Sequence, residues 1–355
     1  MCWRGGRCSK RVELVDNLLS PEATNEILQG LKKGGQRGQA LTHLIIEDNC
    51  VCDINAPVLL QLLETYQRNE SNKLHTLKVR TADLFLEPPL SSWDGSSYPT
   101  PQSIISLPSA LQQIFQGILV LDLSHQSLSQ VAVYAIINAL SHYQSKIAHL
   151  KLESCDLRTD SLDQIFLTAK SSSSMETLNV SGNMYTANSH TGLVELLRDG
   201  RLISLNIANC KFSLHGWQEH LVNEFVSALK NTTHLQQLQL SGNQFNENDL
   251  RVLARIFVEP SAKPRSKGHN LCLDLSFNHA LSPQAMIKFA NTLRSSRNTP
   301  NHMTLEHLRF HASNDGVQNQ ELLRELRLAI PSVDLWSLHS ASDYDTFIAE
   351  QQSQM

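Results

Sequence analysis

Histidine and cysteine are the residue types in this chain with the broadest chemistry, and there are 15 histidines and seven cysteines. Cys50 and Cys52 are one residue apart, whereas zinc sites typically use pairs separated by about two to four residues, together with a second pair. His307 and His311 could chelate one ion only on a helix, because on a strand they are about 13 Å apart. We therefore predict no metal site and assign Cys50 and Cys52 to packing within a turn.

Catalytic and phosphate-binding motifs are likewise missing. The segment 30–35 has the glycine spacing of a phosphate-binding loop, but Gln36 replaces the lysine that such a loop needs. We interpret this segment as the end of a helix followed by a loop. Neither a G-x-S-x-G elbow nor an H-E-x-x-H pair occurs. The sequence therefore predicts no catalytic residue, no cofactor and no enzyme activity.

Composition narrows the class of protein further. The 355 residues are 41% hydrophobic and 18% charged, with a net charge of −4, which favours a folded chain and argues against a nucleic-acid-binding protein. No apolar run approaches the roughly 18 residues of a membrane span, and residues 1–10 lack the apolar stretch of a secretory signal. The odd number of scattered cysteines argues against a disulfide framework. We expect a monomeric cytoplasmic protein without a membrane span.

The elements that position these residues repeat along the chain. The clearest copy, residues 235–245, fits L-x-x-L-x-L-x-x-N-x-L. The first strand leucine of this pattern, or its equivalent, recurs at positions 12, 44, 77, 121, 150, 178, 205, 238, 273, 308 and 333. Between these positions, apolar residues at helical spacing predict helices over 56–68, 130–143 and 247–258. Ser282 before Pro283 predicts the start of another helix.

This pattern resembles the leucine-rich repeat family, in the helical-repeat subtype of the ribonuclease inhibitor, over nearly the whole chain. The resemblance implies an α/β solenoid shaped as a horseshoe, with a parallel β-sheet on the concave face and α-helices on the convex face. Residues 1–342 would form a single domain of about 11 repeats, with an inserted loop near 86–104, and 343–355 a C-terminal tail. Parallel strands are expected near positions 45, 78, 122, 151, 179, 206, 239, 274 and 309.

The asparagine of the pattern ends each strand segment in a turn. Its amide can bond the backbone of the adjacent repeat, which a buried polar group requires. The position is filled by Asn49, Asn183, Asn243 and Asn278, and by cysteine at Cys155 and Cys210. We expect both cysteines to be buried. Ala82 and Gln126 depart from the pattern, which predicts irregular turns there.

Residues between the strand leucines are expected to face the concave surface. Long charged or aromatic side chains gather toward the two ends of the repeat array, with small neutral side chains between them as clearance. Because such residues supply most binding energy at protein interfaces, we predict partner contacts there. The candidate partner-binding residues are His43, Glu47, Lys78, Arg80, His149, Lys151, Glu153, His307, Arg309, His311 and Trp336. Two alternatives stay open: a solvated face without a partner, and binding by the inserted loop through Trp93 and Tyr98.

The function predicted from these observations is a non-enzymatic module that holds a protein partner on its concave face. The chain resembles the leucine-rich-repeat effectors that bacterial pathogens deliver into the cytoplasm of host cells. In that case it would act on a host protein without a cleaved signal peptide. The alternative is a regulator of a small GTPase, since GTPase-activating proteins of the Ran type use a leucine-rich-repeat crescent. Those proteins typically add a long acidic C-terminal tail, which this chain lacks.

Overall fold

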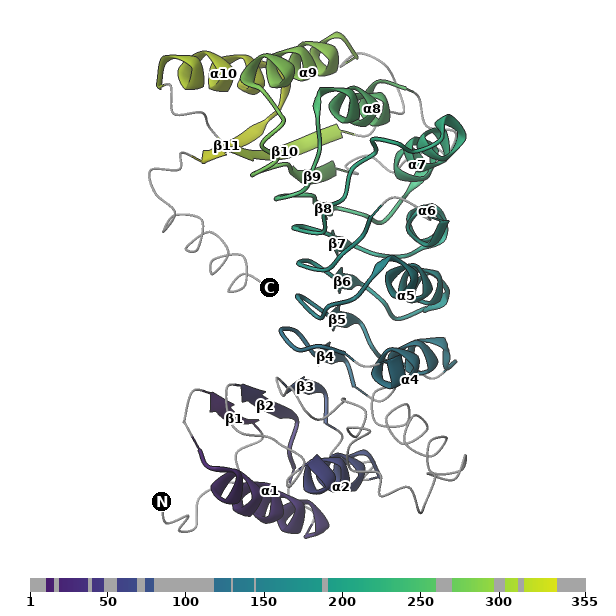
Figure 1. The fold of residues 1–355 in the computed structure, drawn as a ribbon, viewed down its shortest axis with the longest axis vertical. Coiled ribbons are helices and arrows are strands. Elements are labelled where there is room, and N and C mark those ends of the chain that lie inside the picture. Colours follow the sequence, from purple (N-terminus) through teal and green to yellow (C-terminus); the bar gives the residue numbers. More distant parts are fainter. Residues whose placement is uncertain are drawn as a thin grey trace, which may run out of the picture. The chain divides into compact units, whose positions relative to one another are not determined.

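Figure 1 shows the fold in a computed structural model of the chain. The structure describes residues 11–15, 19–37, 40–47, 56–68, 74–79, 118–128, 130–143, 145–186, 191–259, 270–296, 304–311 and 316–336. These residues fall into two compact units, Met1–Asn183 and Met184–Met355, which are considered one at a time.

The first unit alternates strands with helices. Its strands are β1 (Arg11–Val15), β2 (His43–Glu47), β3 (Thr76–Val79), β4 (Val120–Asp122), β5 (His149–Lys151) and β6 (Thr177–Asn179). Its described helices are α1 (Pro21–Gln36), α2 (Ala56–Arg68), α4 (Gln130–Ser141) and α5 (Thr159–Ser171). Consecutive strands pair in parallel in chain order. Each repeat therefore adds one strand to the same sheet edge.

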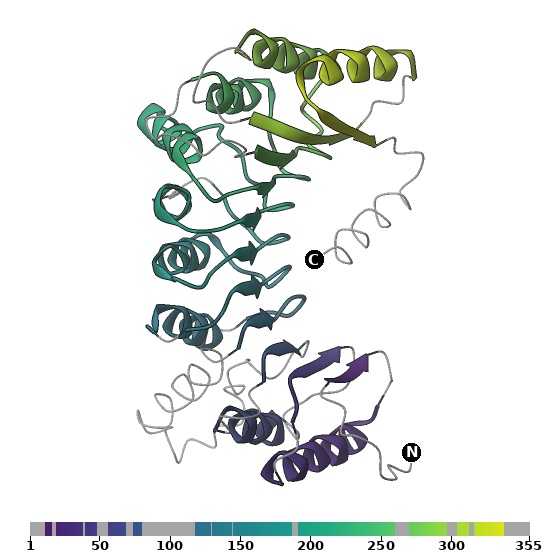
Figure 2. The same ribbon diagram turned by 180° about the vertical axis from the view of Figure 1, so that it is seen from behind.

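The second unit continues the same alternation. Its strands are β7 (Ser204–Asn206), β8 (Gln237–Gln239), β9 (Asn270–Asp274), β10 (Thr304–His311) and β11 (Ser332–Trp336). Its helices are α6 (Thr191–Asp199), α7 (Glu219–Asn231), α8 (Glu247–Val258), α9 (Pro283–Ser296) and α10 (Gly316–Ala329). These strands also pair in parallel and in chain order. In each unit the helices lie on one side of the strands (Figures 1 and 2).

The sheet register confirms the repeat assignment. The predicted first strand leucines lie directly opposite one another from strand to strand, as in Leu77–Leu121 and Leu238–Leu273. The degenerate ends fit as well, since Val12 pairs with Leu44 and Val333 with Leu308. All nine predicted strand positions fall on or beside an observed strand. The α/β leucine-rich-repeat architecture inferred from the spacing is therefore correct.

The core of each unit lies between sheet and helices. Strand leucines such as Leu44, Leu150 and Leu308 have no exposed surface. The helices close the core with one apolar face, for example Leu250 and Phe257 of α8. A single strand–helix repeat has no such second layer, so its apolar face is buried only when neighbours stack against it. None of the described helices is long and apolar enough to cross a membrane.

Helix boundaries follow the sequence closely, apart from the C-terminal ends of α1 and of α4, which ends at Ser141 and not at 143. Helices α2 and α8 begin and end where apolar spacing predicted, and α9 begins at Pro283 with Ser282 Oγ accepting from Ala285 N at 3.2 Å. The interpretation of residues 30–35 as a helix end and loop is wrong, because α1 continues to Gln36. The reason is packing: a Cβ at Gly35 would lie 2.9 Å from the Tyr66 ring of α2. Glycine there lets two helices approach closely.

Several expectations fall outside the described residues. They are the turn residues Asn49 and Ala82, the paired cysteines Cys50 and Cys52, the site residue Arg80, the inserted loop at 86–104 with Trp93 and Tyr98, and the tail at 343–355. A single domain over residues 1–342 also stays a prediction.

Candidate functional site

Across the described repeats, side chains form two rows, one in the turns and one on the strands. In the turn row, Asn183 uses its whole amide: Oδ1 accepts from Cys155 N and Leu157 N, both at 3.0 Å, and Nδ2 donates to Leu152 O and Val180 O, both at 2.7 Å. Three of these four backbone partners belong to the preceding repeat. The predicted bond between adjacent repeats is therefore confirmed, and it satisfies a polar group that is 4% exposed.

The same arrangement recurs in the second unit. Asn243 Oδ1 accepts from Cys210 N at 2.9 Å and Phe212 N at 3.0 Å, and its Nδ2 donates to Ile207 O at 2.8 Å and Leu240 O at 3.1 Å. Asn278 repeats the pattern one strand further along, with Oδ1 accepting from Phe245 N at 3.1 Å. The turn row is thus a structural feature of the stack, and its residues are unsuited to contact a ligand.

Cysteine and glutamine take the place of asparagine in some turns. Cys155 and Cys210 are fully buried, as predicted, and Cys155 Sγ lies 3.1 Å from Leu123 O. Burial raises the pKa of the Cys155 thiol to about 12, so the thiol stays protonated and unreactive near neutral pH. The expected irregularity at Gln126 is wrong, because its Nε2 donates to Val79 O at 2.7 Å and Leu123 O at 2.9 Å. The longer amide reaches the same two kinds of carbonyl.

The residue before the turn position adopts a left-handed backbone conformation. Gly182 and Gly242 have φ values of 69° and 63°, which glycine adopts without strain. A Cβ at Gly242 would lie 1.7 Å from Asn209 Oδ1 of the neighbouring turn. The glycine therefore serves both the backbone angle and the close stacking of successive turns.

The second row lies on the strand face, defined here as the side-chain positions between the core leucines. In the first unit, sheet register places Asp122 of β4 between Lys78 of β3 and Lys151 of β5. Lys78 Nζ is 3.8 Å from Asp122 Oδ2, while Asp122 Oδ1 accepts from Ser124 N at 3.1 Å. Because neighbouring strands are about 4.8 Å apart, two cations flank one nearly buried carboxylate.

Further polar contacts extend this face of the first unit. His149 Nδ1 lies 2.9 Å from Thr177 Oγ1, and Asn179 Nδ2 donates to Glu153 Oε2 at 3.4 Å. His43 Nδ1 lies 2.9 Å from Thr42 Oγ1. Burial, followed by the nearby positive charge of Arg11, lowers the pKa of His43 from its ordinary value. Lys78, His149 and Glu153 are therefore held in defined positions by residues of neighbouring strands.

In the second unit the order of charges is reversed. Arg309 of β10 lies in register between Asp274 of β9 and Asp334 of β11. Its Nη1 is 4.0 Å from Asp274 Oδ2 and its Nε is 3.7 Å from Asp334 Oδ2. His307 bridges two residues of β11, with Nε2 3.2 Å from Asp334 Oδ2 and Nδ1 2.9 Å from Ser332 Oγ. The structure thus brings the predicted His307 and Arg309 together around one carboxylate.

Serine, histidine and aspartate also make up a hydrolase triad, but this cluster differs from one. A triad buries the aspartate to stabilise an imidazolium, whereas the Asp334 side chain is 50% exposed. The His307 contacts therefore orient side chains on an open surface. Among the described residues, no group of three or more His, Cys, Asp or Glu side chains could hold a metal ion.

Two of the small residues between the predicted contact groups are buried and bonded to the backbone. Asn179 and Asn206 are both 4% exposed, and each Oδ1 accepts from the backbone N–H two residues later, at 3.0 and 2.9 Å. Asp122 and Asp274 make the same bond. The sequence signal was an Asn or Asp followed two residues later by a small residue, and it marks a local turn.

The structure locates most of the predicted site residues on the strands. The residues that lie in strands are His43, Lys78, His149, Lys151, His307 and Arg309, and Glu153 lies two residues after the end of β5. For Glu47, His311 and Trp336 the strand position is described and the side chain is not. Sequence reasoning missed Asp122, Asp334 and Ser332 as partners, because only the register shows which strand positions are neighbours.

One parallel strand per repeat, leucines in register and an amide ladder in the turns define a leucine-rich-repeat fold. No model of a known protein family matches the sequence, and no curated protein matches it. Among solved structures, the chain is similar to the leucine-rich repeat-containing protein LegL7 from Legionella pneumophila. The two are 16% identical over 93% of this chain and 94% of that chain, with a TM-score of 0.48.

Proposed function

We propose that this chain is a non-enzymatic protein-interaction module that binds a protein partner through its strand face. The observation that supports this most is the contrast within each repeat: leucines satisfy the core and the turn row satisfies the backbone. The charged residues Lys78, Lys151, His307 and Arg309 serve neither purpose. Long charged side chains on a rigid scaffold are suited to recognising a complementary surface.

The first unit offers the larger group of contacts. His43, Lys78, Lys151 and Glu153 are partly exposed, and the Lys78 side chain retains 38% of its surface. In the second unit, Arg309 and His307 expose 23% and 25% of their side chains beside Asp334. We assign the main contact to the first unit, including Glu47 and Arg80, and a second contact to the second unit, including His311 and Trp336.

The test is a triple variant, Lys78→Ala, Arg80→Ala and Lys151→Ala, in the full chain. A partner is first captured from a host-cell lysate with the unchanged chain as bait. The affinity of this partner for the unchanged chain and for the variant is then measured with purified components. We expect a loss of about 2 kcal/mol or more in binding, since hot-spot truncations reach that size. The melting transition should change little, because surface substitutions usually cost within about 0.5 kcal/mol.

A control triple variant changes Lys146, Arg158 and Lys211 to alanine; all three are exposed. It removes the same charge, so a nonspecific electrostatic attraction would weaken equally in both variants. If affinity survives the strand-face variant and falls only on replacing Trp93 and Tyr98, the inserted loop is the binding site. If neither variant has an effect and the partner hydrolyses GTP faster with the chain present, the GTPase-regulator alternative holds.

We further propose that the module acts as an effector on a host protein after delivery into the host cytoplasm. The resemblance of the repeats to those of delivered effectors supports this, together with the loops rich in serine, asparagine and glutamine. A fusion of the full chain to an adenylate cyclase reporter, expressed in a bacterium with an intact secretion apparatus, should raise cyclic AMP inside infected cells. An equal signal from a secretion-deficient strain would contradict this role.

A further inference from the structure

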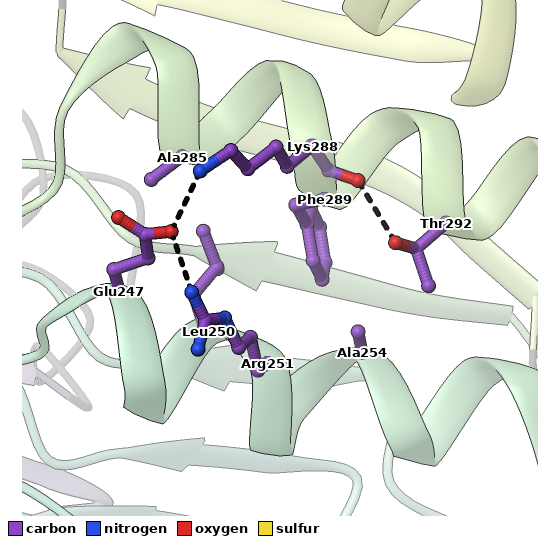
Figure 3. A pocket seen from close by; sticks show the side chains of 8 residues that line it. All are labelled: Glu247, Leu250, Arg251, Ala254, Ala285, Lys288, Phe289 and Thr292. Atoms are coloured by element: carbon purple, nitrogen blue, oxygen red, sulfur yellow. Dashed lines mark hydrogen bonds and ion pairs between the residues drawn. The ribbon is translucent and has the colours of Figure 1, made fainter.

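The helical side of the second unit carries a hollow that the proposed strand-face function does not use. It lies between α8 and α9, has a volume of about 290 Å³ and is floored by Leu250, Ala254, Ala285 and Phe289 (Figure 3). Two of its lining residues, Ala254 and Ala285, have side chains of a single methyl group, which leaves space between the two helices. The hollow is therefore built into the packing of the two helices.

The floor of this hollow is held in place from below. Phe289 of α9 is 3% exposed and packs edge-to-face against Phe257 of α8, with ring centroids 6.3 Å apart. Leu250 is 2% exposed. An apolar side chain entering from outside would meet a preformed apolar surface, so little rearrangement would oppose binding.

One end of the hollow carries an excess of positive charge. Glu247 Oε1 accepts from Lys288 Nζ at 3.0 Å and from Arg251 Nη2 at 2.9 Å, so two cations share a single carboxylate (Figure 3). These hydrogen bonds hold the pKa of Glu247 below its ordinary value and keep it ionised. The Lys288 and Arg251 side chains remain 68% and 69% exposed, and each has further N–H groups to donate.

The same two-to-one arrangement recurs along this side of the unit. Glu259 Oε2 lies 3.1 Å from Lys230 and its Oε1 lies 2.8 Å from Arg255. Glu325 lies 3.6 Å from Arg294 and 3.8 Å from Arg324. Helix α9 itself contains no aspartate or glutamate. Each of the three clusters has one more cation than carboxylates, so N–H groups of lysine and arginine remain there to meet an anionic side chain.

We propose that the hollow between α8 and α9 docks a segment of a partner protein in which an apolar side chain lies next to aspartate or glutamate. The apolar side chain enters above Ala254, Ala285 and Phe289. The acidic side chain accepts hydrogen bonds from Arg251 and Lys288 at the end of the hollow. This second surface is independent of the strand face, because its residues come from helices on the other side of the sheet.

The experiment measures fluorescence anisotropy of a labelled peptide, Glu-Glu-Leu-Glu-Glu-Phe-Glu, on the full chain. A second peptide with glutamine in place of every glutamate is the matched probe. We expect the acidic peptide to bind and the glutamine peptide to bind more weakly. Added salt should weaken the acidic peptide, since its contacts are largely exposed. Equal binding of the two peptides would overturn the proposal.

The main variant combines Arg251→Gln with Lys288→Gln, and its control combines Arg158→Gln with Lys146→Gln at exposed positions of the first unit. Both remove one arginine and one lysine. The main variant should weaken the acidic peptide by about tenfold or more, as loss of interfacial charge pairs does, and the control should leave it unchanged. Unchanged binding in the main variant would refute the assignment.

A second variant, Ala254→Leu, fills the hollow and keeps the charges. It should also weaken the acidic peptide, whereas Lys78→Ala with Lys151→Ala on the strand face should not. If the strand-face variant abolished peptide binding, the peptide would bind the strand face and not the hollow, which would overturn the proposal. Vesicles of phosphatidylserine and phosphatidylcholine that bind the chain while the peptide does not would identify a membrane partner instead.

Discussion

The polar side chains of the turn row are buried and bond the backbone, whereas those of the strand face are partly exposed and pair with other side chains. In the turn row, Asn183 and Asn243 are 4% and 6% exposed, and each makes at least four bonds to backbone atoms. On the strand face, Lys78 and Asp334 are 38% and 50% exposed and each makes a side-chain ion pair. Only the first kind of residue is required for the repeats to stack.

The contrast between the two rows indicates which residues of such a fold can be substituted without loss of stability. The loss of a buried amide removes four hydrogen bonds to the backbone at once, and a buried polar group left without a partner costs about 1 to 3 kcal/mol. An exposed ion pair is worth little to stability, because water and salt screen it. Binding specificity can therefore change on the strand face while the turns hold the structure. The two rows should differ sharply when their residues are replaced.

The largest effect is expected for Asn243→Ala. The N–H groups of Cys210 and Phe212 and the carbonyl of Ile207 lose their bond to Asn243, while Leu240 O keeps its bond from Asn278. We therefore expect a loss of about 3 to 5 kcal/mol in the free energy of unfolding. Urea denaturation followed by circular dichroism measures this. Asn223→Ala on the exposed side of α7 is the control and should change stability by less than about 0.5 kcal/mol. Similar losses in both would remove the distinction between the rows.

A smaller loss is expected for Gly242→Ala. The new Cβ would meet Asn209 Oδ1, and alanine at a φ of 63° is strained by roughly 1 to 2 kcal/mol. Gly216→Ala isolates the strain, because Gly216 has a φ of 85° with nothing within 4 Å of the added Cβ. Melting curves of both variants should show the greater loss at Gly242. Equal losses would mean that turn stacking does not require glycine.

On the strand face, Asp274→Asn should cost about 1 kcal/mol. The amide can still accept from Ser276 N, but Arg309 loses a carboxylate that is only 6% exposed. Asp334→Asn should cost less than about 0.5 kcal/mol, because the Asp334 side chain is half exposed. Urea midpoints at neutral pH measure both. A larger loss for Asp334 would show that the open end of this face also supports the fold.

The smallest effect is expected from the titration of His43. Its pKa is lowered in the folded chain, mainly by burial and then by Arg11, so the unfolded chain binds the proton more tightly. The stability from neutral His43 is therefore present above the ordinary value of 6.5 and declines as the pH falls through it toward the folded pKa. The decline should be slightly shallower in His43→Gln, measured as urea midpoint against pH. A steeper decline in His43→Gln would mean that the pKa of His43 is raised in the folded chain, and would contradict the prediction.

Spacing in the sequence was enough to predict the strands, since a five-position leucine pattern leaves little freedom in register. It also identified the turn asparagines and the burial of Cys155 and Cys210. It failed at Gly35, where the reason for glycine is a ring from the next helix, and at Gln126, where a longer amide reaches the usual carbonyls. It also missed the ring of partners around Arg309. Such features depend on contacts with side chains of a neighbouring helix or strand, and the sequence of one segment does not show which side chains those are.

The amide ladder in the turns also has a direction, and that has an evolutionary consequence. Asn183, Asn243 and Asn278 each donate to a carbonyl of the repeat before them, at Leu152, Ile207 and Leu240. The segment that a duplication can copy without breaking a bond therefore runs from one turn position to the next, so that it contains the end of one repeat and the start of the following one. If such a segment were gained or lost, each turn asparagine would still donate to an equivalent carbonyl of the repeat before it. Array length can then drift by whole repeats, while the rule for joining neighbours stays the same.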